Sequence, residues 1–165
     1  MKVLAIDPGY DRVGFAILEK KERASQEIVH FSSCFTTVRT LAFTERLKAV
    51  GEEMERLIET FKPEVCAIEK LYFVTNQKTA MAVSEARGAF LYIAAKNSLP
   101  IFEYTPLEIK SAVTGHGHSD KRQIITMIPR LVAIDKTIRH DDEYDAIAIG
   151  ITCLARVKNI PKKEL

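Results

Sequence analysis

The chain has 165 residues, of which 47% are hydrophobic and 28% charged, and its formal net charge at pH 7 is +2. This composition is ordinary for a globular domain with a core of useful size. No apolar run approaches the ~20 residues that cross a membrane, and the first residues do not resemble a secretory signal, so we expect a cytoplasmic protein. The few, widely spaced cysteines argue against a disulfide framework or thiolate zinc site and favour packing as small hydrophobes: Cys34, Cys66 and Cys153.

Short apolar runs separated by turns predict three strands in the first part of the chain. We place them at residues 3–7, 12–18 and 27–35, with Pro8-Gly9 as the first turn and a charged turn at residues 20–23. Because the connections are short, the three strands are expected to form an antiparallel meander.

The hydrophobic period then changes to that of a helix. Apolar residues three and four apart predict an amphipathic helix over about residues 41–61, which Pro63 ends. The remaining elements are expected in this order: a strand at 64–69, a helix at 79–97, a strand at 100–106, a short helix at 107–113, a loop at 114–120, a helix at 121–132 and a last helix from 142. This order predicts an α/β fold in one domain over residues 1–165, with a five-stranded mixed sheet (antiparallel meander plus parallel strands) and helices packed on its faces.

The predicted helix at 79–97 is apolar around most of its surface, including Met81, Val83, Phe90, Leu91 and Ile93. A helix that is apolar on more than one face is buried on more than one face. A second subunit could cover one face, which would make a homodimer, and burial within one chain explains the pattern equally well.

Four carboxylates stand at the ends of predicted elements. Asp7 and Glu69 each follow a short apolar strand, where an ionised carboxylate is costly unless it is paired or holds a cation. Asp142 and Asp145 are three residues apart at the start of the last helix and therefore share one face. Each has a structural explanation too, because an aspartate often caps a turn and acidic residues stabilise a helix N-terminus. Asp141 is a further candidate and could be the N-cap itself.

Considered together, these carboxylates predict a metal site. Four carboxylates that converge on one point cannot all stay ionised without a counter-charge. Hard divalent cations with oxygen ligands supply it, and Mg²⁺ or Mn²⁺ is the natural choice. Two such ions about 4 Å apart would activate a water and stabilise the leaving oxygen in phosphodiester hydrolysis.

The segment from residue 108 to residue 139 carries a local excess of positive charge. It has six basic side chains and three acidic ones: Lys110, Lys121, Arg122, Arg130, Lys136 and Arg139 against Glu108, Asp120 and Asp135. Such an excess beside a carboxylate cluster suits a polyanionic substrate, although a solvated helical face has the same composition.

With these motifs in view, the sequence resembles the bacterial Holliday-junction resolvases of the RuvC type, which have the RNase H fold. The resemblance covers nearly the whole chain and depends on the joint order and spacing of motifs that are not specific one by one. They are Ile6-Asp7-Pro8-Gly9, Ala67-Ile68-Glu69 followed by Tyr72, Ser84-Glu85-Ala86-Arg87-Gly88, Thr105-Pro106, Lys110, Val113-Thr114-Gly115, Asp120-Lys121 and Asp142-x-x-Asp145-Ala146.

The resemblance implies a homodimer that cuts four-way DNA junctions symmetrically, in homologous recombination and repair, with Mg²⁺ or Mn²⁺. It also implies a branch-migration partner of the RuvA and RuvB type. It maps the metal ligands onto Asp7, Glu69, Asp142 and Asp145.

The resemblance further implies DNA contacts. It places the aromatic at Tyr72 near the junction crossover, where a base can stack on it, and we assign Phe73 to the core. It places Lys110 and Lys121 near the scissile phosphate, where Lys121 would offset charge in the transition state. We add Arg87, Arg122, His116 and His118 as expected DNA contacts, although the two histidines also fit an ordinary loop.

Two positions depart from the usual pattern of the resolvases. Tyr144 stands where a small residue usually precedes the last aspartate, which affects packing at the helix start. Asp141 makes an acidic doublet with Asp142 and leaves the ligand set open.

Two other functions remain open at this point. One is a related nuclease of the same fold that acts on an RNA–DNA hybrid or an RNA precursor, and the segment from Lys110 to Lys121 fits a junction resolvase better. The other is a junction-binding module that cuts nothing. The four carboxylates argue against it, because a pure binder gains nothing from negative charge facing phosphates.

Overall fold

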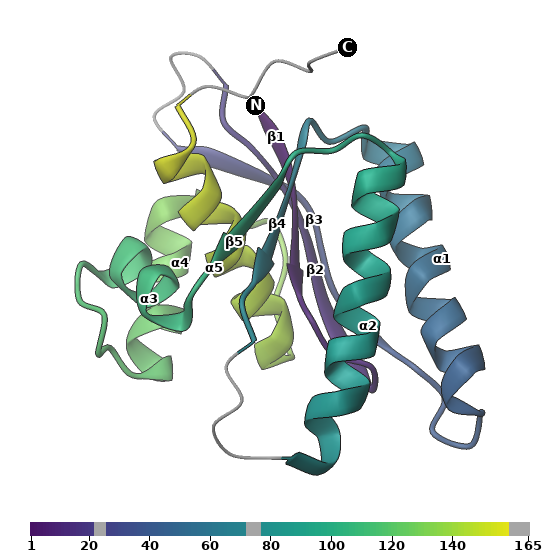
Figure 1. Cartoon of the computed structure of the whole chain (residues 1–165). Coiled ribbons are helices and arrows are strands. Elements are labelled where there is room, and N and C mark those ends of the chain that lie inside the picture. Colours follow the sequence, from purple (N-terminus) through teal and green to yellow (C-terminus); the bar gives the residue numbers. More distant parts are fainter. Residues whose placement is uncertain (22–25, 72–76, 159–165) are drawn as a thin grey trace.

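The computed structural model describes residues 1–21, 26–71 and 77–158 (Figure 1). In this part of the chain, strands form one mixed sheet in the order β5-β4-β1-β2-β3-β6. Their bounds are β1 (Lys2–Asp7), β2 (Arg12–Glu19), β3 (Glu27–Thr36), β4 (Val65–Glu69), β5 (Ile101–Tyr104) and β6 (Val132–Ala133). The predicted meander is confirmed, since β1, β2 and β3 pair antiparallel, and β4 and β5 continue the sheet parallel to β1.

The sheet has a sixth strand that we did not expect. β6 has two residues and pairs parallel with the start of β3, Glu27 opposite Val132 and Ile28 opposite Ala133. The expectation of five strands was wrong on this point, because a two-residue strand carries no periodicity. We had counted residue 132 with the preceding helix.

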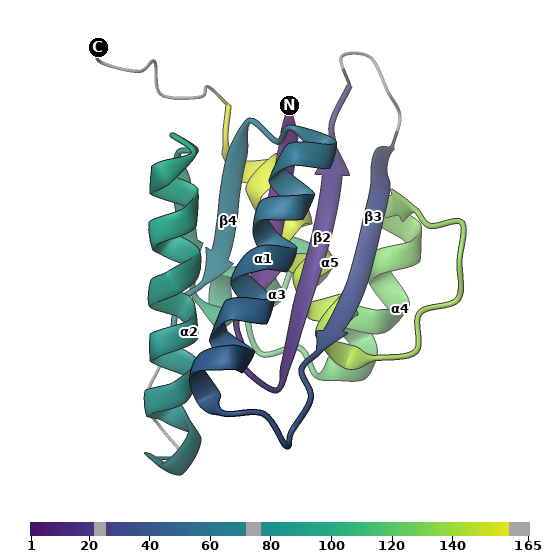
Figure 2. The same cartoon turned by 90° about the vertical axis from the view of Figure 1, so that its right-hand side faces the viewer.

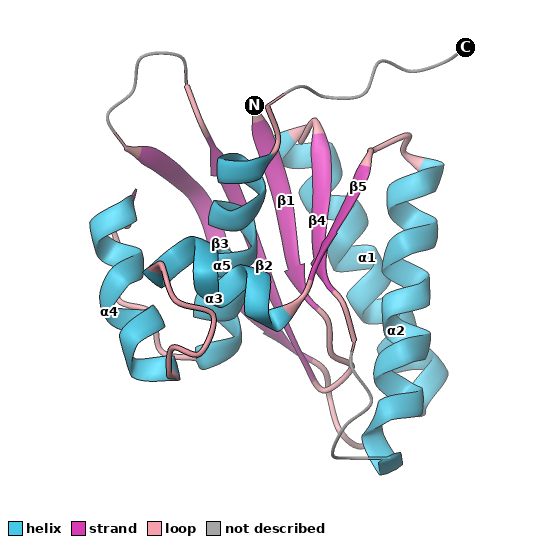
Figure 3. Cartoon of the chain, turned by 60° about the vertical axis from the view of Figure 1, so that its left-hand side comes forward, coloured by secondary structure: helices cyan, strands magenta, loops and turns pink. Residues whose placement is uncertain are grey.

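Helices cover both faces of the sheet (Figures 1 and 2). One face is covered by α1 (Phe43–Phe61) and α2 (Gln77–Lys96), and the other by α3 (Pro106–Thr114), α4 (Lys121–Leu131) and α5 (Asp141–Arg156) (Figure 3). Alternate side chains of β1 point to opposite faces, as in any strand. Val3 and Ala5 therefore pack in the core under α5, and Leu4 and Ile6 pack in the core under α1 and α2.

The helix starts differ in how their free N–H groups are capped. Thr105 and Glu108 form a capping box at α3, and Asp120 and Gln123 form one at α4. At α5 the N-cap is His140, without a side-chain hydrogen bond. The expectation that Asp141 could be the N-cap was therefore wrong by one residue, because the Asp141 carboxylate faces Lys121 instead of its own backbone.

Helix α5 lies directly against the sheet because β2 has a glycine at the contact. A Cβ atom at Gly14 would lie 1.9 Å from the carbonyl oxygen of Asp142, so no other residue fits there without a shift of the helix. This approach sets the N-terminus of α5 beside the end of β1.

Among the described residues, no helix is long and apolar enough to cross a membrane.

Candidate active site

Asp7 is the last residue of β1, and its neighbours in the sheet bring Glu69 to the same edge. β1 and β4 run parallel with Ile6 opposite Ile68, so the two carboxylates follow at equivalent positions. Burial raises the pKa of the Asp7 carboxyl well above its usual range, and the charges of Glu69, Asp145 and Asp142 raise it further. The structure therefore brings the four predicted carboxylates within electrostatic reach of one another.

Glu69 and Asp145 respond to the same environment. Burial, followed by the charge of Asp145, raises the pKa of Glu69 to about 7, while Lys110 acts in the opposite direction. Burial also raises the pKa of Asp145, although Lys121 opposes the shift. Carboxylates with raised pKa values around one point are typical of a site that binds a cation or transfers protons.

Basic side chains partner the carboxylates of α5. The Nζ atom of Lys121 lies 3.1 Å from Oδ2 of Asp145 and 3.2 Å from Oδ2 of Asp141. The Nε atom of Arg12 lies 3.3 Å from Oδ2 of Asp142. Part of the negative charge is thus balanced by the chain itself.

Sequence reasoning missed Arg12 and Cys34 as neighbours of the site. The Cys34 thiol donates a 3.6 Å hydrogen bond to Oδ2 of Asp142, the carboxylate oxygen that Arg12 also faces. Cys34 is opposite Gly14 in the β2–β3 ladder. Only the register of that ladder could have indicated this proximity.

The turn after Asp7 is held by a buried arginine that the sequence did not single out. The Arg46 guanidinium pairs with the Asp11 carboxylate and lies 4.6 Å from the centroid of the Tyr10 ring. Its Nε donates a 2.9 Å hydrogen bond to Oγ1 of Thr37. These contacts fix the chain that leads out of Asp7.

A cavity of about 240 Å³ opens beside these carboxylates. Its lining includes two acidic and two basic side chains, and the full set is Glu69, Pro106, Ile109, Lys110, Lys121, Ile124, Asp145 and Ala148. It therefore brings together two predicted ligands and the two lysines predicted to lie near the scissile phosphate. A cavity with both signs of charge suits a phosphate whose counter-charge is shared by lysines.

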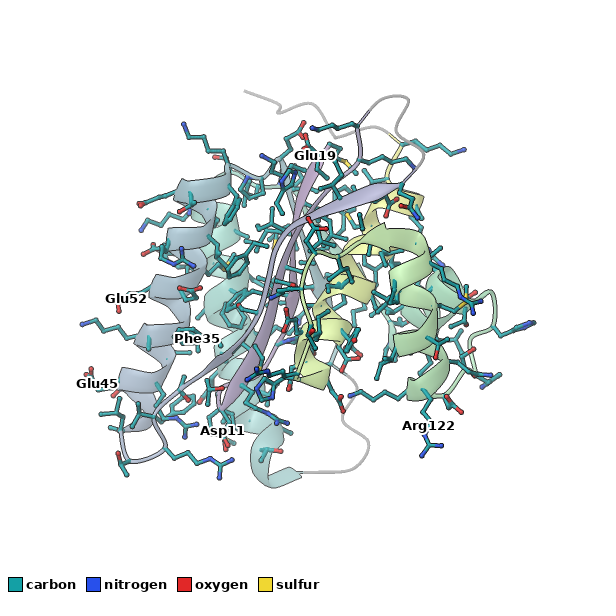
Figure 4. All side chains as sticks on the ribbon, turned by 180° about the vertical axis from the view of Figure 1, so that it is seen from behind. Asp11, Glu19, Phe35, Glu45, Glu52 and Arg122 are labelled. Atoms are coloured by element: carbon teal, nitrogen blue, oxygen red, sulfur yellow. The ribbon has the colours of Figure 1, made fainter. Side chains whose placement is uncertain are left out.

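The other predicted DNA contacts lie in different places. His116 and His118 are exposed on the connection between α3 and α4 and do not line the cavity. Arg122 is exposed on α4, directed away from the sheet, at the same end of the molecule as Asp11 (Figure 4). Tyr72 and Phe73 lie outside the described residues.

Arg87 is engaged within the fold. Its guanidinium donates a 3.3 Å hydrogen bond to the carbonyl oxygen of Glu69 and pairs with the Glu103 carboxylate. In the described structure it ties α2 to the ends of β4 and β5, and its contact with DNA stays a prediction.

The two departures from the resolvase pattern are accommodated at the start of α5. Tyr144 is half-buried and packs against the core on that face of the sheet. Asp141 is exposed and shares Lys121 with Asp145. The larger residue therefore fits without displacing the carboxylates.

The four carboxylates make contacts that bear on whether they can hold a metal ion. Among the described residues, no group of three or more histidine, cysteine or carboxylate side chains is placed closely enough to hold a metal ion as it stands. The reason is visible in the ion pairs, because Asp142 faces Arg12 and Asp145 faces Lys121. The donor type nevertheless fits, since all four candidates supply oxygen, which hard divalent cations prefer.

A mixed sheet of this order, with carboxylates gathered at the end of its central strand and at the start of α5, defines a nuclease of the RNase H-like class. A family model described as crossover junction endodeoxyribonuclease RuvC matches residues 3–153. The chain belongs to this family, whose members depend on a divalent metal ion, and it is a DNA endonuclease of crossover junctions.

Relatives and solved structures agree with this assignment over most of the chain. The crossover junction endodeoxyribonuclease RuvC of Thermosipho melanesiensis is 43% identical over 155 residues, 94% of this chain and 97% of the relative. That of Petrotoga mobilis is 43% identical over 148 residues, 90% of each chain. The structure of Thermus thermophilus RuvC in complex with a Holliday junction substrate superimposes with a TM-score of 0.86, at 27% identity over 93% of each chain. The predicted fold class is confirmed.

Proposed function

We propose that this chain resolves four-way DNA junctions by metal-dependent phosphodiester hydrolysis, with Asp7, Glu69, Asp142 and Asp145 as the metal ligands. The observation that carries the assignment is the surroundings of Asp7, whose pKa is raised by burial and by the three other carboxylates. Such an arrangement is unfavourable without a cation, and a structural role gives no reason to keep it. The junction substrate is supported by the T. thermophilus relative, whose structure holds one.

The cation is proposed to be Mg²⁺ or Mn²⁺. Four carboxylates are enough to share two ions, and we propose two per site. When bound, the ions supply Lewis acidity and activate water for attack on phosphorus.

Basic side chains of the chain itself face two of the proposed metal ligands, so metal binding requires an exchange of partners. For Asp142 and Asp145 to bind a metal, they must release Arg12 and Lys121, which now face them. Lys121 then stays in the cavity together with Lys110, where two ammonium groups can offset the charge of a phosphate. We therefore assign Lys121 to catalysis and Lys110 to phosphate binding.

Symmetric cutting requires a homodimer, and α2 is the surface that we propose for it. Its inner side packs in the core through residues such as Phe90 and Ile93. Its outer side exposes Met81 by 72% and Tyr92 by 69%, with Gly88 between them, where an added Cβ would meet nothing within 4 Å. Residues 81, 88 and 92 share a helical face, so two copies of α2 can approach closely there.

The test is cleavage of an end-labelled synthetic four-way junction, beside a linear duplex and an RNA–DNA hybrid, in Mg²⁺ and in EDTA. Paired nicks in the junction alone, and only with metal, are expected. Cleavage of the hybrid would transfer the assignment to another nuclease activity of the fold. Junction binding without a cut in either buffer would favour a binding module.

Three further expectations stay predictions. They concern a single domain over residues 1–165, a cytoplasmic location, and cooperation with a branch-migration complex of the RuvA and RuvB type.

A further inference from the structure

The first turn of α5 carries Asp142, yet no side chain caps it. His140 makes no capping hydrogen bond, in contrast with the capping boxes at the starts of α3 and α4. An uncapped helix start leaves N–H groups without partners and frays more easily. A different contact must therefore hold this turn if Asp142 is to keep a fixed position.

The side chain of Glu143, in the same turn, makes such a contact with β3 and with the segment after α4. The Glu143 carboxylate accepts a 2.6 Å hydrogen bond from Oγ of Ser32 on β3 and lies 2.5 Å from Nζ of Lys136. Lys136 also donates a 2.5 Å hydrogen bond to the carbonyl oxygen of Ser32. We call Glu143, Ser32 and Lys136 the Glu143 clamp. Figure 2 shows the chain after α4 returning to the start of α5 beside β3.

Two members of the Glu143 clamp, Glu143 and Ser32, are buried, whereas Lys136 reaches Glu143 from a half-exposed position. The side chain of Glu143 is 7% exposed, and a carboxylate in such a place is costly unless it is paired; both contacts are made to its Oε1 atom. Both Ser32 and Lys136 therefore restrict how Glu143, and the turn with it, can move.

This contact differs from the others that the turn makes. Arg12 faces Asp142, and Lys121 faces Asp141 and Asp145, so these ion pairs involve candidate ligands and must change when a cation binds. Glu143 lies about 100° around the helix from Asp142, on the side away from Asp145. Its contacts can stay intact while the ligands exchange partners.

We propose that Glu143 is a positioning residue, which through Ser32 and Lys136 fixes the rotation of the first turn of α5 and so presents Asp142 toward Asp7. The inference rests on the proposed role of Asp142 as a metal ligand. Partners that orient a metal ligand without touching the ion commonly change metal affinity by 10- to 100-fold when they are lost.

The test uses Glu143→Gln in the full chain, which keeps the size of the side chain and removes its charge. Mn²⁺ binding is measured by calorimetry without DNA, and cleavage is measured against Mg²⁺ concentration. We expect Mn²⁺ affinity to fall by roughly tenfold. The Mg²⁺ midpoint of cleavage should rise in parallel, with recovery of the rate at high Mg²⁺ and unchanged junction affinity in EDTA.

Two further variants guard against misfolding of Glu143→Gln. Lys136→Met changes a half-exposed side chain, and Ser32→Ala removes one hydroxyl, so both should fold, and both should shift the metal midpoints in the same direction. The matched control is Arg156→Met, which removes the 2.6 Å ion pair with Glu108 at the other end of α5. It should lower the melting temperature without changing either midpoint.

The outcomes separate this inference from the proposed site. If the variants of the Glu143 clamp lower the melting temperature as the control does and leave both metal midpoints unchanged, the positioning role is refuted. If Asp142→Asn itself binds Mn²⁺ and cleaves like the wild type, the proposed ligand set is wrong and the inference fails with it. If the metal midpoints shift in the variants of the Glu143 clamp and not in Arg156→Met, the positioning role is supported.

Discussion

The Nζ atom of Lys121 lies 3.1 Å from Oδ2 of Asp145, so the first residue of α4 is joined to a candidate metal ligand on α5. Because the same ammonium group also faces Asp141, it stands where two negative charges meet at the edge of the cavity. A cation in this place can move from a carboxylate to a phosphate without leaving the site. Its effect should therefore be larger in the transition state than in the ground state.

Lys121→Ala is accordingly expected to slow junction cleavage more than it weakens junction binding. A lost electrostatic donor of this kind typically costs about 10²–10³ in rate. Single-turnover cleavage and binding in EDTA measure the two effects separately. Arg122→Ala is the control on the neighbouring exposed residue, which should weaken binding with little change in the rate at saturation. Equal losses in rate and affinity for Lys121→Ala would reduce it to a phosphate-positioning contact.

Asp7→Asn should bind four-way junctions and leave them uncut. The change removes one proposed metal ligand from the centre of the carboxylates and no proposed contact to phosphate. Binding by gel shift in EDTA should be equal to or tighter than that of the wild type, since one negative charge near the DNA is lost. Substantial cleavage by this variant in Mg²⁺ would show that Asp7 is not central to the site.

Stability without metal should depend on pH through Glu69. Its pKa is about 7 in the folded state against an ordinary value of 4.5, so between these values the folded state binds more protons than the unfolded state. This contribution is complete below pH 4.5 and is lost as the pH rises through 7. We expect the metal-free protein to lose on the order of 2 kcal/mol of unfolding free energy from this group between pH 5 and pH 8.

Chemical denaturation in EDTA across this pH range measures the effect, and Glu69→Gln is the matched comparison. The variant should lose the part of the slope that Glu69 contributes, while Asp7 and Asp145 keep theirs, and it should be more stable than the wild type at pH 8. If the unfolding free energy depends on pH equally in both proteins, a group other than Glu69 causes the dependence.

Tyr92→Asp should convert the proposed dimer to a monomer of unchanged fold. Tyr92 is 69% exposed on α2, so the single chain loses little when it becomes charged, whereas a facing copy would bury the charge. Sedimentation at micromolar concentration should give 18.6 kDa, and paired nicking of a junction should become single nicking. Leu107→Asp on α3, where the side chain is 54% exposed, is the control and should leave the oligomeric state unchanged. A wild-type protein that sediments as a monomer would refute the dimer directly.

Much of the architecture followed from periodicity, because buried strands and amphipathic helices repeat at different intervals. The carboxylates of Asp7 and Glu69 were predictable as a pair, since both close short apolar strands. β6 was not predictable, because two residues have no period and its pairing with β3 depends on where α4 ends.

The surroundings of the carboxylates were less accessible from sequence. Glu143 is in an acidic run that reads as helix-start charge, and its partner Ser32 lies 111 residues away in the chain. Arg12 and Cys34 meet Asp142 only because of the register of β2 and β3 and the angle at which α5 crosses them. Such contacts follow from tertiary geometry, and local patterns do not encode them.

The absence of a side chain at Gly14 determines more than the packing of one helix. The carbonyl of Asp142 occupies the space that a Cβ atom at this position would take, so the gap between the strand and the helix is set by two backbones. Even a methyl group there would push the first turn of α5 away from the sheet. The acidic residues of that turn would then lie farther from the strand that ends in Asp7. The distance between the start of α5 and the end of β1 thus depends on β2, a strand that carries none of the proposed metal ligands. We therefore expect Gly14→Ala to lower nuclease activity although every acidic residue is still present.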